Sequence, residues 1–381
     1  MKKIFCLGTL LGFLASVGYA GAQPALKDAF KGKFLVGAAL NETQFTGQNT
    51  NQSALIKKQF NSITPENVMK WEMIHPELNR YDFGPSDAYV AFGETNGMFI
   101  IGHNLVWHAQ TPPWVFEDAR GNLVTRDVLL QRMRDHIFSV AGRYRGRIHG
   151  WDVVNEALNE DGTLRDSPWR KIIGDDFLVK AFEFAHAADP HAELYYNDYS
   201  LENEPKRTGA IALAKKLQAA GVPLTGIGSQ GHVTLDWPLP QEEDAMISAF
   251  GKLGLKVMIT ELDVDVLPKV DSNQEADVSR RVGGNAALNP YANGLPEAQQ
   301  LALAQRYAEL FAVYVKHSDV IGRVTFWGVT DGDSWLNSWP VTGRTSYPLL
   351  FDRAGNPKLA FAKVIETARP GKTKKLATTN F

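Results

Sequence analysis

The sequence predicts an α/β protein with the (β/α)8 TIM barrel fold, and three observations support this fold class. Short apolar runs alternate along the chain with longer amphipathic stretches, as expected for parallel strands separated by helices. Eight of these runs end in polar or aromatic residues, whereas a doubly wound sheet would gather such residues at one switch point. The chain has 381 residues and no Pro/Thr/Ser or Gly/Ser linker, which fits one barrel domain.

The apolar runs are the expected strands, because each is short and is followed by polar residues. They cover 34–38, 62–63, 99–105, 148–154, 193–196, 226–229, 256–259 and 320–326. Amphipathic helices are expected at 129–143, 176–187, 205–220, 242–253 and 296–316. The stretch 266–295 follows neither pattern. Loops of this length are uncommon unless functional, so we expect it to border the active-site face.

The polar ends of the runs mark the expected active site, because a barrel enzyme builds its site from the carboxyl ends of its strands. In chain order these ends are Asn41-Glu42, Glu66-Asn67, His103-Asn104, Asn155-Glu156, Asn197-Asp198, Gln230 with His232, Glu261 with Asp263, and Trp327 with Asp331. We expect their side chains to converge on one face of the barrel.

The first residues have the pattern of a secretory signal peptide covering 1–22. A Lys2-Lys3 head precedes an apolar run and the small residues Ala20-Gly21-Ala22. The catalytic barrel is then expected at 23–370, followed by a flexible tail at 371–381. We expect export through a Sec-type signal, to the periplasm or out of the cell. Cys6 lies in the signal, so the exported domain would depend on its core and not on disulfides.

Composition and motifs argue against several function classes. A formal charge of −2 gives no electrostatic basis for binding nucleic acid. No later stretch is long and apolar enough to span a membrane. The sequence has no His-Glu-x-x-His motif, no cysteine cluster and no Gly-x-Ser-x-Gly elbow. We therefore expect no metal and no other cofactor, and we expect a monomer.

Two acids stand at the ends of apolar strands. Glu156 ends the run Trp-Asp-Val-Val-Asn-Glu, and Glu261 follows Val-Met-Ile-Thr. An ionised carboxylate is costly to desolvate, so two such acids favour a catalytic role over an ion pair or a helix cap. Glycoside hydrolysis needs one carboxyl to protonate the leaving oxygen and, with retention, a second about 5 Å away to attack the sugar. We expect the charge of Glu261 to keep Glu156 protonated.

The sequence resembles glycoside hydrolase family ten, the barrel-type xylanases, through motifs spread over nearly the whole expected domain. They are Thr64-Pro-Glu-Asn-Val-Met-Lys-Trp-Glu72, Gly102-His-Asn-Leu-Val-Trp-His108, Trp151-Asp-Val-Val-Asn-Glu156, Tyr196-Asn-Asp-Tyr199, Gly228-Ser-Gln-Gly-His232, Ile259-Thr-Glu-Leu-Asp263, Phe326-Trp-Gly-Val-Thr-Asp331 and Pro348-Leu-Leu-Phe-Asp352. The resemblance implies a retaining endo-1,4-β-xylanase that hydrolyses internal bonds of xylan and xylo-oligosaccharides through a covalent glycosyl-enzyme intermediate.

The resemblance also implies a role for each matching residue. Glu156 would be the acid/base and Glu261 the nucleophile, which His232 would hold in line with support from Asp263. The remaining matches would bind substrate. They are Asn155 on the 2-hydroxyl of the attacked sugar, His103, Trp107 and Gln230 around that sugar, Glu66, Asn67 and Lys70 on the next glycone sugar, Trp327 and Trp335 as wall and roof of the glycone subsites, and Tyr199 beneath the first leaving-group sugar.

Several alternatives stay open. Ala109 and Ser200 replace residues common in the family, which leaves the contacts with leaving-group sugars undefined. Asn197 and Asp198 could be structural hydrogen-bonding residues or sugar ligands. The substrate could be a β-1,4-glucan, since glucose differs from xylose by one hydroxymethyl group. An inactive sugar-binding protein is the rival from another class, and the presence of both acids argues against it.

Overall fold

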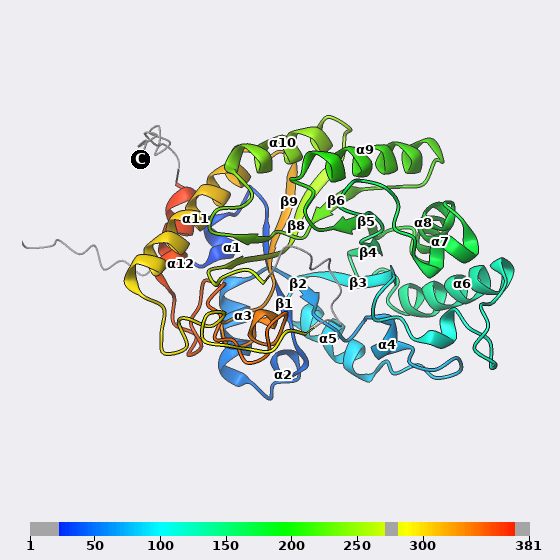
Figure 1. The fold of residues 1–381 in the computed structure, drawn as a ribbon, viewed down its shortest axis with the longest axis horizontal. Coiled ribbons are helices and arrows are strands. Elements are labelled where there is room, and N and C mark those ends of the chain that lie inside the picture. Colours follow the sequence, from blue (N-terminus) through cyan, green and yellow to red (C-terminus); the bar gives the residue numbers. More distant parts are fainter. Residues whose placement is uncertain (1–22, 271–280, 370–381) are drawn as a thin grey trace, which may run out of the picture.

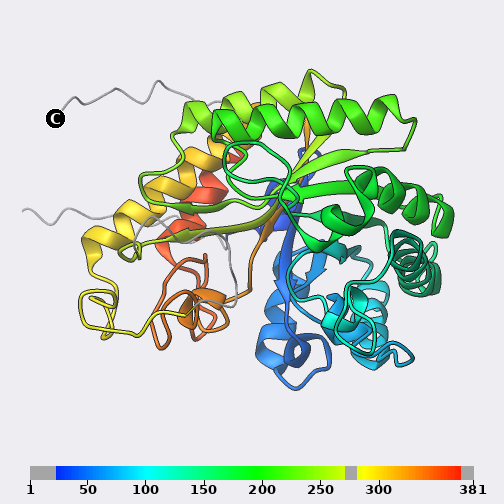
Figure 2. The same cartoon turned by 45° about the vertical axis from the view of Figure 1, so that its right-hand side comes forward.

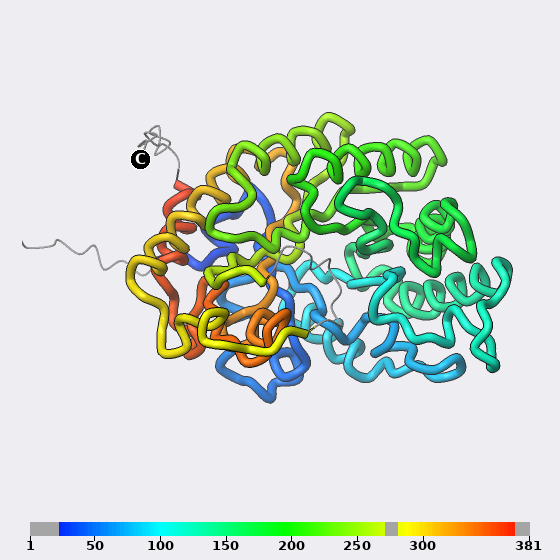
Figure 3. Tube along the Cα trace, in the orientation of Figure 1, coloured from blue at the N-terminus to red at the C-terminus, as the bar shows by residue number. Residues whose placement is uncertain are grey.

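Eight parallel strands close into a barrel in the computed structural model, which describes residues 23–270 and 281–369 (Figure 1). The expected signal peptide at 1–22 and the expected tail at 371–381 lie outside the described residues. The first and last strands pair in parallel, Leu35 opposite Arg323 and Ala38 opposite Phe326, so the barrel has no open edge. Figure 3 shows the two strands side by side. The predicted (β/α)8 barrel is confirmed.

The strands and the helices that surround them alternate along the chain (Figures 1 and 2). The strands are β1 (Leu35–Leu40), β2 (Ser62–Pro65), β3 (Phe99–Trp107), β4 (Gly150–Asn155), β5 (Glu193–Asp198), β6 (Gly226–Ser229), β7 (His232–Thr234), β8 (Lys256–Asp265) and β9 (Ile321–Phe326). The helices are α1 (Leu26–Ala29), α2 (Glu42–Phe45), α3 (Thr50–Gln59), α4 (Trp71–Ile74), α5 (Gly84–Thr95), α6 (Arg126–Arg143), α7 (Pro168–Ile173), α8 (Phe177–Ala188), α9 (Glu204–Ala219), α10 (Pro240–Gly251), α11 (Glu297–Lys316) and α12 (Leu359–Thr367).

The sixth barrel strand is interrupted. β6 pairs with the first half of β8, and the short β7 pairs with its second half, where His232 lies opposite Asp263. Gly231 separates the two pieces with a φ of 80°, a left-handed conformation that suits glycine. The backbone of the break still bonds to β8, because Glu261 N–H donates to Gln230 O at 2.7 Å. The interruption places both Gln230 and His232 at the site.

The described helices include several that hydrophobic periodicity did not predict, among them α3, α5 and α12. In α5 the buried face consists of Ser86, Tyr89, Val90 and Gly93, a set that is only partly apolar. Gly93 lets the helix approach β3 closely, since a Cβ there would lie 2.5 Å from Ile100 Cγ1. Close packing through small residues produces no strong apolar stripe, which explains the missed prediction.

The core has two parts. The larger one fills the space between strands and helices. A smaller cluster of Ile101, Tyr195 and Met258 comes from β3, β5 and β8, the third, fifth and seventh strands of the barrel. Alternate strands contribute the side chains of one interior layer in this fold. The barrel is therefore packed inside, and the site lies above that packing, at the carboxyl ends of the strands.

The stretch 266–295 contains no helix in its described parts, as the sequence predicted. It attaches to the segment that follows β9. Val282 N–H donates to Pro340 O at 2.8 Å, and Thr345 N–H donates to Asn289 Oδ1 at 3.0 Å.

None of the helices in residues 23–270 and 281–369 is long and apolar enough to cross a membrane.

Substitution of Gly102 should destabilise the barrel. Gly102 lies opposite Trp151 in the β3–β4 pairing, and a Cβ at this position would overlap the Trp151 indole. We expect Gly102→Ala to lower the free energy of unfolding by about 1–3 kcal/mol, as overpacking usually does. The melting temperature followed by calorimetry measures this.

Gly142→Ala is the matched control, because nothing lies within 4 Å of its added Cβ and it lies in α6. Alanine there should be neutral or stabilise by about 0.5–1 kcal/mol. Equal melting temperatures for the two variants would contradict this account of the β3–β4 packing.

Candidate active site

The two acids predicted to be catalytic are connected through two amide side chains. Glu156 directly follows β4, Glu261 lies in β8, and both are buried. Asn155 Nδ2 donates to Glu156 Oε1 at 3.2 Å. Asn197 Nδ2 donates to Asn155 Oδ1 at 2.9 Å and to Glu261 Oε1 at 2.8 Å. The structure therefore brings both acids into one hydrogen-bond network.

Glu156 accepts hydrogen bonds at both carboxyl oxygens. Trp107 Nε1 donates to Oε2 at 2.8 Å, and Gln230 Nε2 donates to Oε1 at 2.9 Å. The donors come from the end of β3 and from the break between β6 and β7, so two separate parts of the barrel fix the orientation of the carboxyl. Trp107 and Gln230 thus position the acid, besides the contact with sugar that the resemblance implies.

Burial is the main cause that raises the pKa of Glu156 above its ordinary value, and the negative charges of Asp198 and Glu261 add to it. Hydrogen bonds from Gln230 and Trp107 oppose the shift. The sequence had suggested the charge of Glu261 as the cause. In the structure that charge contributes less than burial and less than Asp198.

Glu261 has the opposite bias. Burial would raise its pKa, but the hydrogen bond from His232 and the electrostatic effects of His103 and His232 lower it below the ordinary value. His232 Nε2 lies 3.1 Å from Glu261 Oε2, and Asn197 supports the other oxygen. The site therefore favours the protonated form of one buried acid and the ionised form of the other, which is how paired carboxyls divide acid and nucleophile roles.

His232 is held between two carboxylates. Its Nδ1 lies 3.1 Å from Asp263 Oδ1, opposite the contact with Glu261. Burial would lower the pKa of His232, but the charge of Asp263 and the bonds to both carboxylates raise it to about 10. The imidazole is a cation at neutral pH. Asp263 is bonded in turn by Trp335, whose Nε1 donates to Asp263 Oδ2 at 2.7 Å.

The sequence alone does not decide whether Asn197 binds sugar or has a structural role, and the structure shows the structural role. Its side chain is fully buried, and Thr260 Oγ1 donates to its Oδ1 at 2.7 Å. Every polar atom of the amide is bonded within the protein. Asp198 is equally buried and binds Lys206 at 3.1 Å. Both are structural hydrogen-bonding residues.

A second group of predicted residues follows β2. Lys70 Nζ donates to Asn67 Oδ1 and to Gln110 Oε1, each at 2.9 Å, and lies 5.3 Å from the Trp107 ring centroid. Burial lowers the pKa of Lys70, while Glu261 and Glu66 act to raise it. Gln110 was missed from the sequence. Its left-handed φ of 46° is visible only in the structure.

His103 and the predicted tryptophans border the nucleophile. His103 Nδ1 lies 2.9 Å from Asp152 Oδ2, and its ring contacts the Trp327 ring edge-on at 5.5 Å. The centroid of the Trp335 ring lies 4.8 Å from that of the His232 ring, and Trp335 stacks on Trp339 with 4.6 Å between the ring centroids. The residues expected as wall and roof therefore lie beside the His232–Glu261 pair.

Tyr199 is connected to the backbone of the acid through Arg165. It directly follows β5 and is half-buried. Arg165 Nη2 donates to its hydroxyl at 2.9 Å, and the Lys206 ammonium lies 3.2 Å from its ring centroid. Arg165 also donates to Glu156 O at 3.2 Å. No sequence motif indicates that Arg165 belongs to the site.

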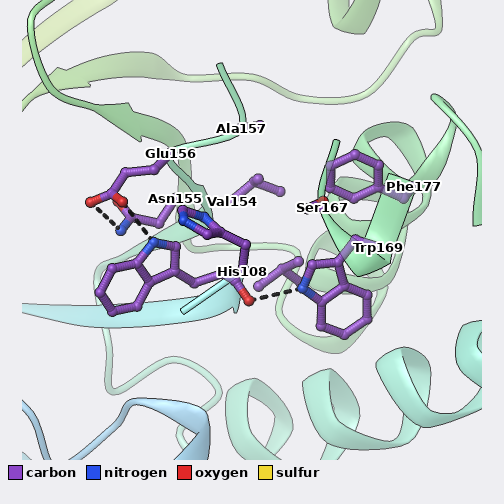
Figure 4. A pocket seen from close by; sticks show the side chains of 10 residues that line it. His108, Val154, Asn155, Glu156, Ala157, Ser167, Trp169 and Phe177 are labelled. Atoms are coloured by element: carbon purple, nitrogen blue, oxygen red, sulfur yellow. Dashed lines mark hydrogen bonds between the residues drawn. The ribbon is translucent and has the colours of Figure 1, made fainter. Parts of the chain in front are cut away.

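A small pocket opens behind Glu156. Figure 4 shows Asn155 and Glu156 on one side of it and Trp169 and Phe177, from α7 and α8, on the other. Trp169 Nε1 donates to Trp107 O at 2.8 Å. Trp169 thus supports the end of β3, where Trp107 donates to the acid.

Within the described parts of the chain, no group of three or more His, Cys, Asp or Glu side chains could hold a metal ion. The arrangement itself suits a double displacement at an anomeric carbon. An ionised carboxylate can attack, and a protonated carboxyl can supply a proton to the leaving oxygen.

Comparisons with known proteins agree with this chemistry. Residues 25–367 match the family described as glycosyl hydrolase family 10. The chain is 47% identical over 368 residues to endo-1,4-beta-xylanase A of Xylanibacter ruminicola, covering 96% of this chain and 99% of that protein. It is 43% identical to the beta-1,4-xylanase of Dictyoglomus thermophilum, covering 93% and 94%.

A solved structure described as a GH10 endoxylanase from a sugarcane soil metagenome superposes with a TM-score of 0.87. The two are 44% identical, and the match covers 90% of this chain and 99% of that one. Both the sequence and the fold are therefore shared over nearly the whole described domain, and the chain belongs to glycosyl hydrolase family 10.

Proposed function

We propose that this protein is a retaining endo-1,4-β-xylanase that hydrolyses internal bonds of xylan and xylo-oligosaccharides. The observation that carries the proposal is the opposite treatment of two buried carboxyls, with the pKa of Glu156 raised and that of Glu261 lowered. The similar proteins of Xylanibacter ruminicola and Dictyoglomus thermophilum are both named as xylanases, which supports xylan as the substrate.

The reaction proceeds in two displacements. Glu261 attacks the anomeric carbon while Glu156 gives its proton to the departing glycosidic oxygen. The new ester bond removes the negative charge of Glu261, and with it one of the causes that raise the pKa of Glu156. Glu156 then accepts a proton from water, which attacks the anomeric carbon and frees Glu261.

The other residues supply binding and alignment. Asn155 bonds the 2-hydroxyl of the attacked sugar, and His232 with Asp263 aligns Glu261. Glycone sugars lie against residues from several strand ends, namely Glu66, Asn67, Lys70, His103, Trp107, Gln230, Trp327 and Trp335. Tyr199 stacks beneath the first leaving-group sugar. These subsite roles belong to the proposal, and their support is the clustering of the side chains around the two acids.

The proposal includes export through the signal at 1–22, to the periplasm or the medium, and a monomeric enzyme without cofactor. The alternative of a β-1,4-glucanase has no feature in its favour, because the similar curated proteins are named as xylanases.

Replacement of the acid should separate substrates by their leaving groups. Glu156→Ala should reduce kcat/KM on xylan by roughly 10²- to 10⁴-fold, the usual contribution of a positioned acid. Its kcat/KM on a dinitrophenyl xylobioside should stay close to wild type, because that leaving group departs without a proton. Added azide should raise turnover by attacking the intermediate and giving a β-glycosyl azide.

Glu204→Ala replaces an exposed acid at the start of α9 and should behave as wild type on both substrates. If Glu156→Ala slowed both substrates equally and azide had no effect, Glu156 would not be the acid/base and the proposed function would lose its basis.

Trp335 should contribute to substrate specificity through its shape, and to the alignment of the nucleophile through its hydrogen bond to Asp263. A flat indole can close over xylose, whereas the hydroxymethyl group of glucose should collide with it. Trp335→Ala should therefore lower kcat/KM for xylosides, by about 1–3 kcal/mol in transition-state binding, and lower it less for matched glucosides. Trp335→Phe keeps a ring but loses the N–H bond to Asp263, so it should slow both substrates in similar proportion.

The number to compare is the xyloside-to-glucoside ratio of kcat/KM in the two variants. An unchanged ratio in Trp335→Ala would mean that the indole only packs against Trp339 and plays no part in specificity.

A further inference from the structure

The acid Glu156 has an unusual backbone. Its φ is 56°, in the left-handed region that residues with a side chain rarely adopt. Such a conformation persists only where surrounding contacts enforce it. The direction of the carboxyl depends on this turn of the chain, because the side chain leaves the strand end at the same residue.

The backbone N–H groups at this turn are each hydrogen-bonded. Glu156 N–H donates to Asn197 O at 2.9 Å. Ala157 N–H donates to the Tyr196 hydroxyl at 3.1 Å, and Leu158 N–H donates to Asp198 Oδ2 at 3.4 Å. All these partners belong to β5, so the neighbouring strand fixes the N–H groups of the segment.

One residue, Arg165, fixes the carbonyl groups. Its Nε donates to Glu156 O and its Nη2 to Leu158 O, both at 3.2 Å, while its own N–H donates to Ala157 O at 2.7 Å. Nη2 also donates to the Tyr199 hydroxyl at 2.9 Å. A planar guanidinium can hold such a divergent set of acceptors, whereas a lysine ammonium cannot span them.

A buried lysine lies against the ring of Tyr199. The Lys206 ammonium is fully buried and lies 3.2 Å from the ring centroid. It binds Asp198 Oδ1 at 3.1 Å and Glu160 Oε1 at 3.2 Å. A cation at this position fixes the ring plane and leaves the opposite face of the ring for a sugar. Asp198 thus supports both the ring, through Lys206, and the backbone after Glu156.

We propose that Arg165 is a positioning residue that couples the sugar platform Tyr199 to the acid Glu156. The guanidinium connects the hydroxyl of the platform to the carbonyl of the acid, so displacement of one shifts the other. A sugar stacked on Tyr199 is thereby held in line with the carboxyl that protonates its oxygen. This inference rests on the proposed function, since it needs Glu156 to be the acid.

The test is the dependence of rate on leaving group. For a series of aryl xylobiosides, log kcat/KM is plotted against the pKa of the released phenol. In Arg165→Lys the acid should be misaligned, so poor leaving groups should slow by roughly 10- to 100-fold, as misplacement of a reacting group typically does. Dinitrophenolate should depart almost as in wild type. The slope of the plot should therefore become steeper.

Arg170→Lys is the matched control. Arg170 bonds the carbonyl of Leu164 at 3.0 Å in the same loop and also Asp175, but no bond connects it to Glu156. It should leave the slope unchanged. Tyr199→Phe removes only the hydroxyl and should steepen the slope in part. The double variant should be no worse than Arg165→Lys alone, because both changes break one connection.

Failure of the proposed coupling can be distinguished from failure of the proposed function. If Arg165→Lys lowers kcat/KM equally for every leaving group, as a merely loosened loop would, the coupling is wrong even though the enzyme remains a xylanase. Full additivity of Tyr199→Phe and Arg165→Lys would also overturn it. If wild-type protein fails to hydrolyse xylan, or Glu156→Ala shows no dependence on leaving group, it is the proposed function that fails.

Discussion

An ionised carboxylate buried at the end of a barrel strand is the constraint on which this site depends. Burial alone would raise the pKa of Glu261 and so favour its protonated form, which cannot attack. The His232 cation at one carboxylate oxygen and the Asn197 amide at the other offset this effect of burial. His232 in turn stays charged because Asp263 lies on its far side. The nucleophile therefore depends on contacts from three strands, and the interruption between β6 and β7 is what places His232 among them.

Glu156 shows the complementary arrangement. Hydrogen bonds from Gln230 and Trp107 offset the effect of its burial only in part, so its pKa stays raised and the protonated form is favoured. Its neighbours, Trp107 and Gln230, are neutral donors that orient the carboxyl without supplying a cation. The difference between the two acids thus comes from the charge of their partners and not from their depth, since both are buried to the same extent, with 5% of their surface exposed. The backbone turn at Glu156 and the network through Asn155 and Asn197 hold the two carboxyls in one rigid frame.

Much of this could be predicted from sequence because a barrel repeats one rule. Polar residues after apolar strands must meet at one face, which identified Glu156, Glu261 and His232 before any coordinates, whereas Trp107 was expected only from the resemblance to the family. What escaped prediction depends on contacts between distant segments. The role of Arg165 follows from three carbonyl and hydroxyl acceptors that share no motif, and that of Gln110 from its bond to Lys70 forty residues away in sequence. Helix α5 escaped because Gly93 packs it closely without an apolar stripe.

The central claim is that Glu261 is the ionised nucleophile and forms a covalent bond with the sugar. A 2-deoxy-2-fluoro xylobioside with a dinitrophenyl leaving group should form the intermediate and hydrolyse it very slowly. Digestion and mass spectrometry of the inactivated enzyme then locate the sugar. The account predicts one fluoroxylobiosyl group per chain, on the carboxylate of Glu261. A label on Glu156 or on another residue, or release of an α-configured product without any adduct, would contradict it.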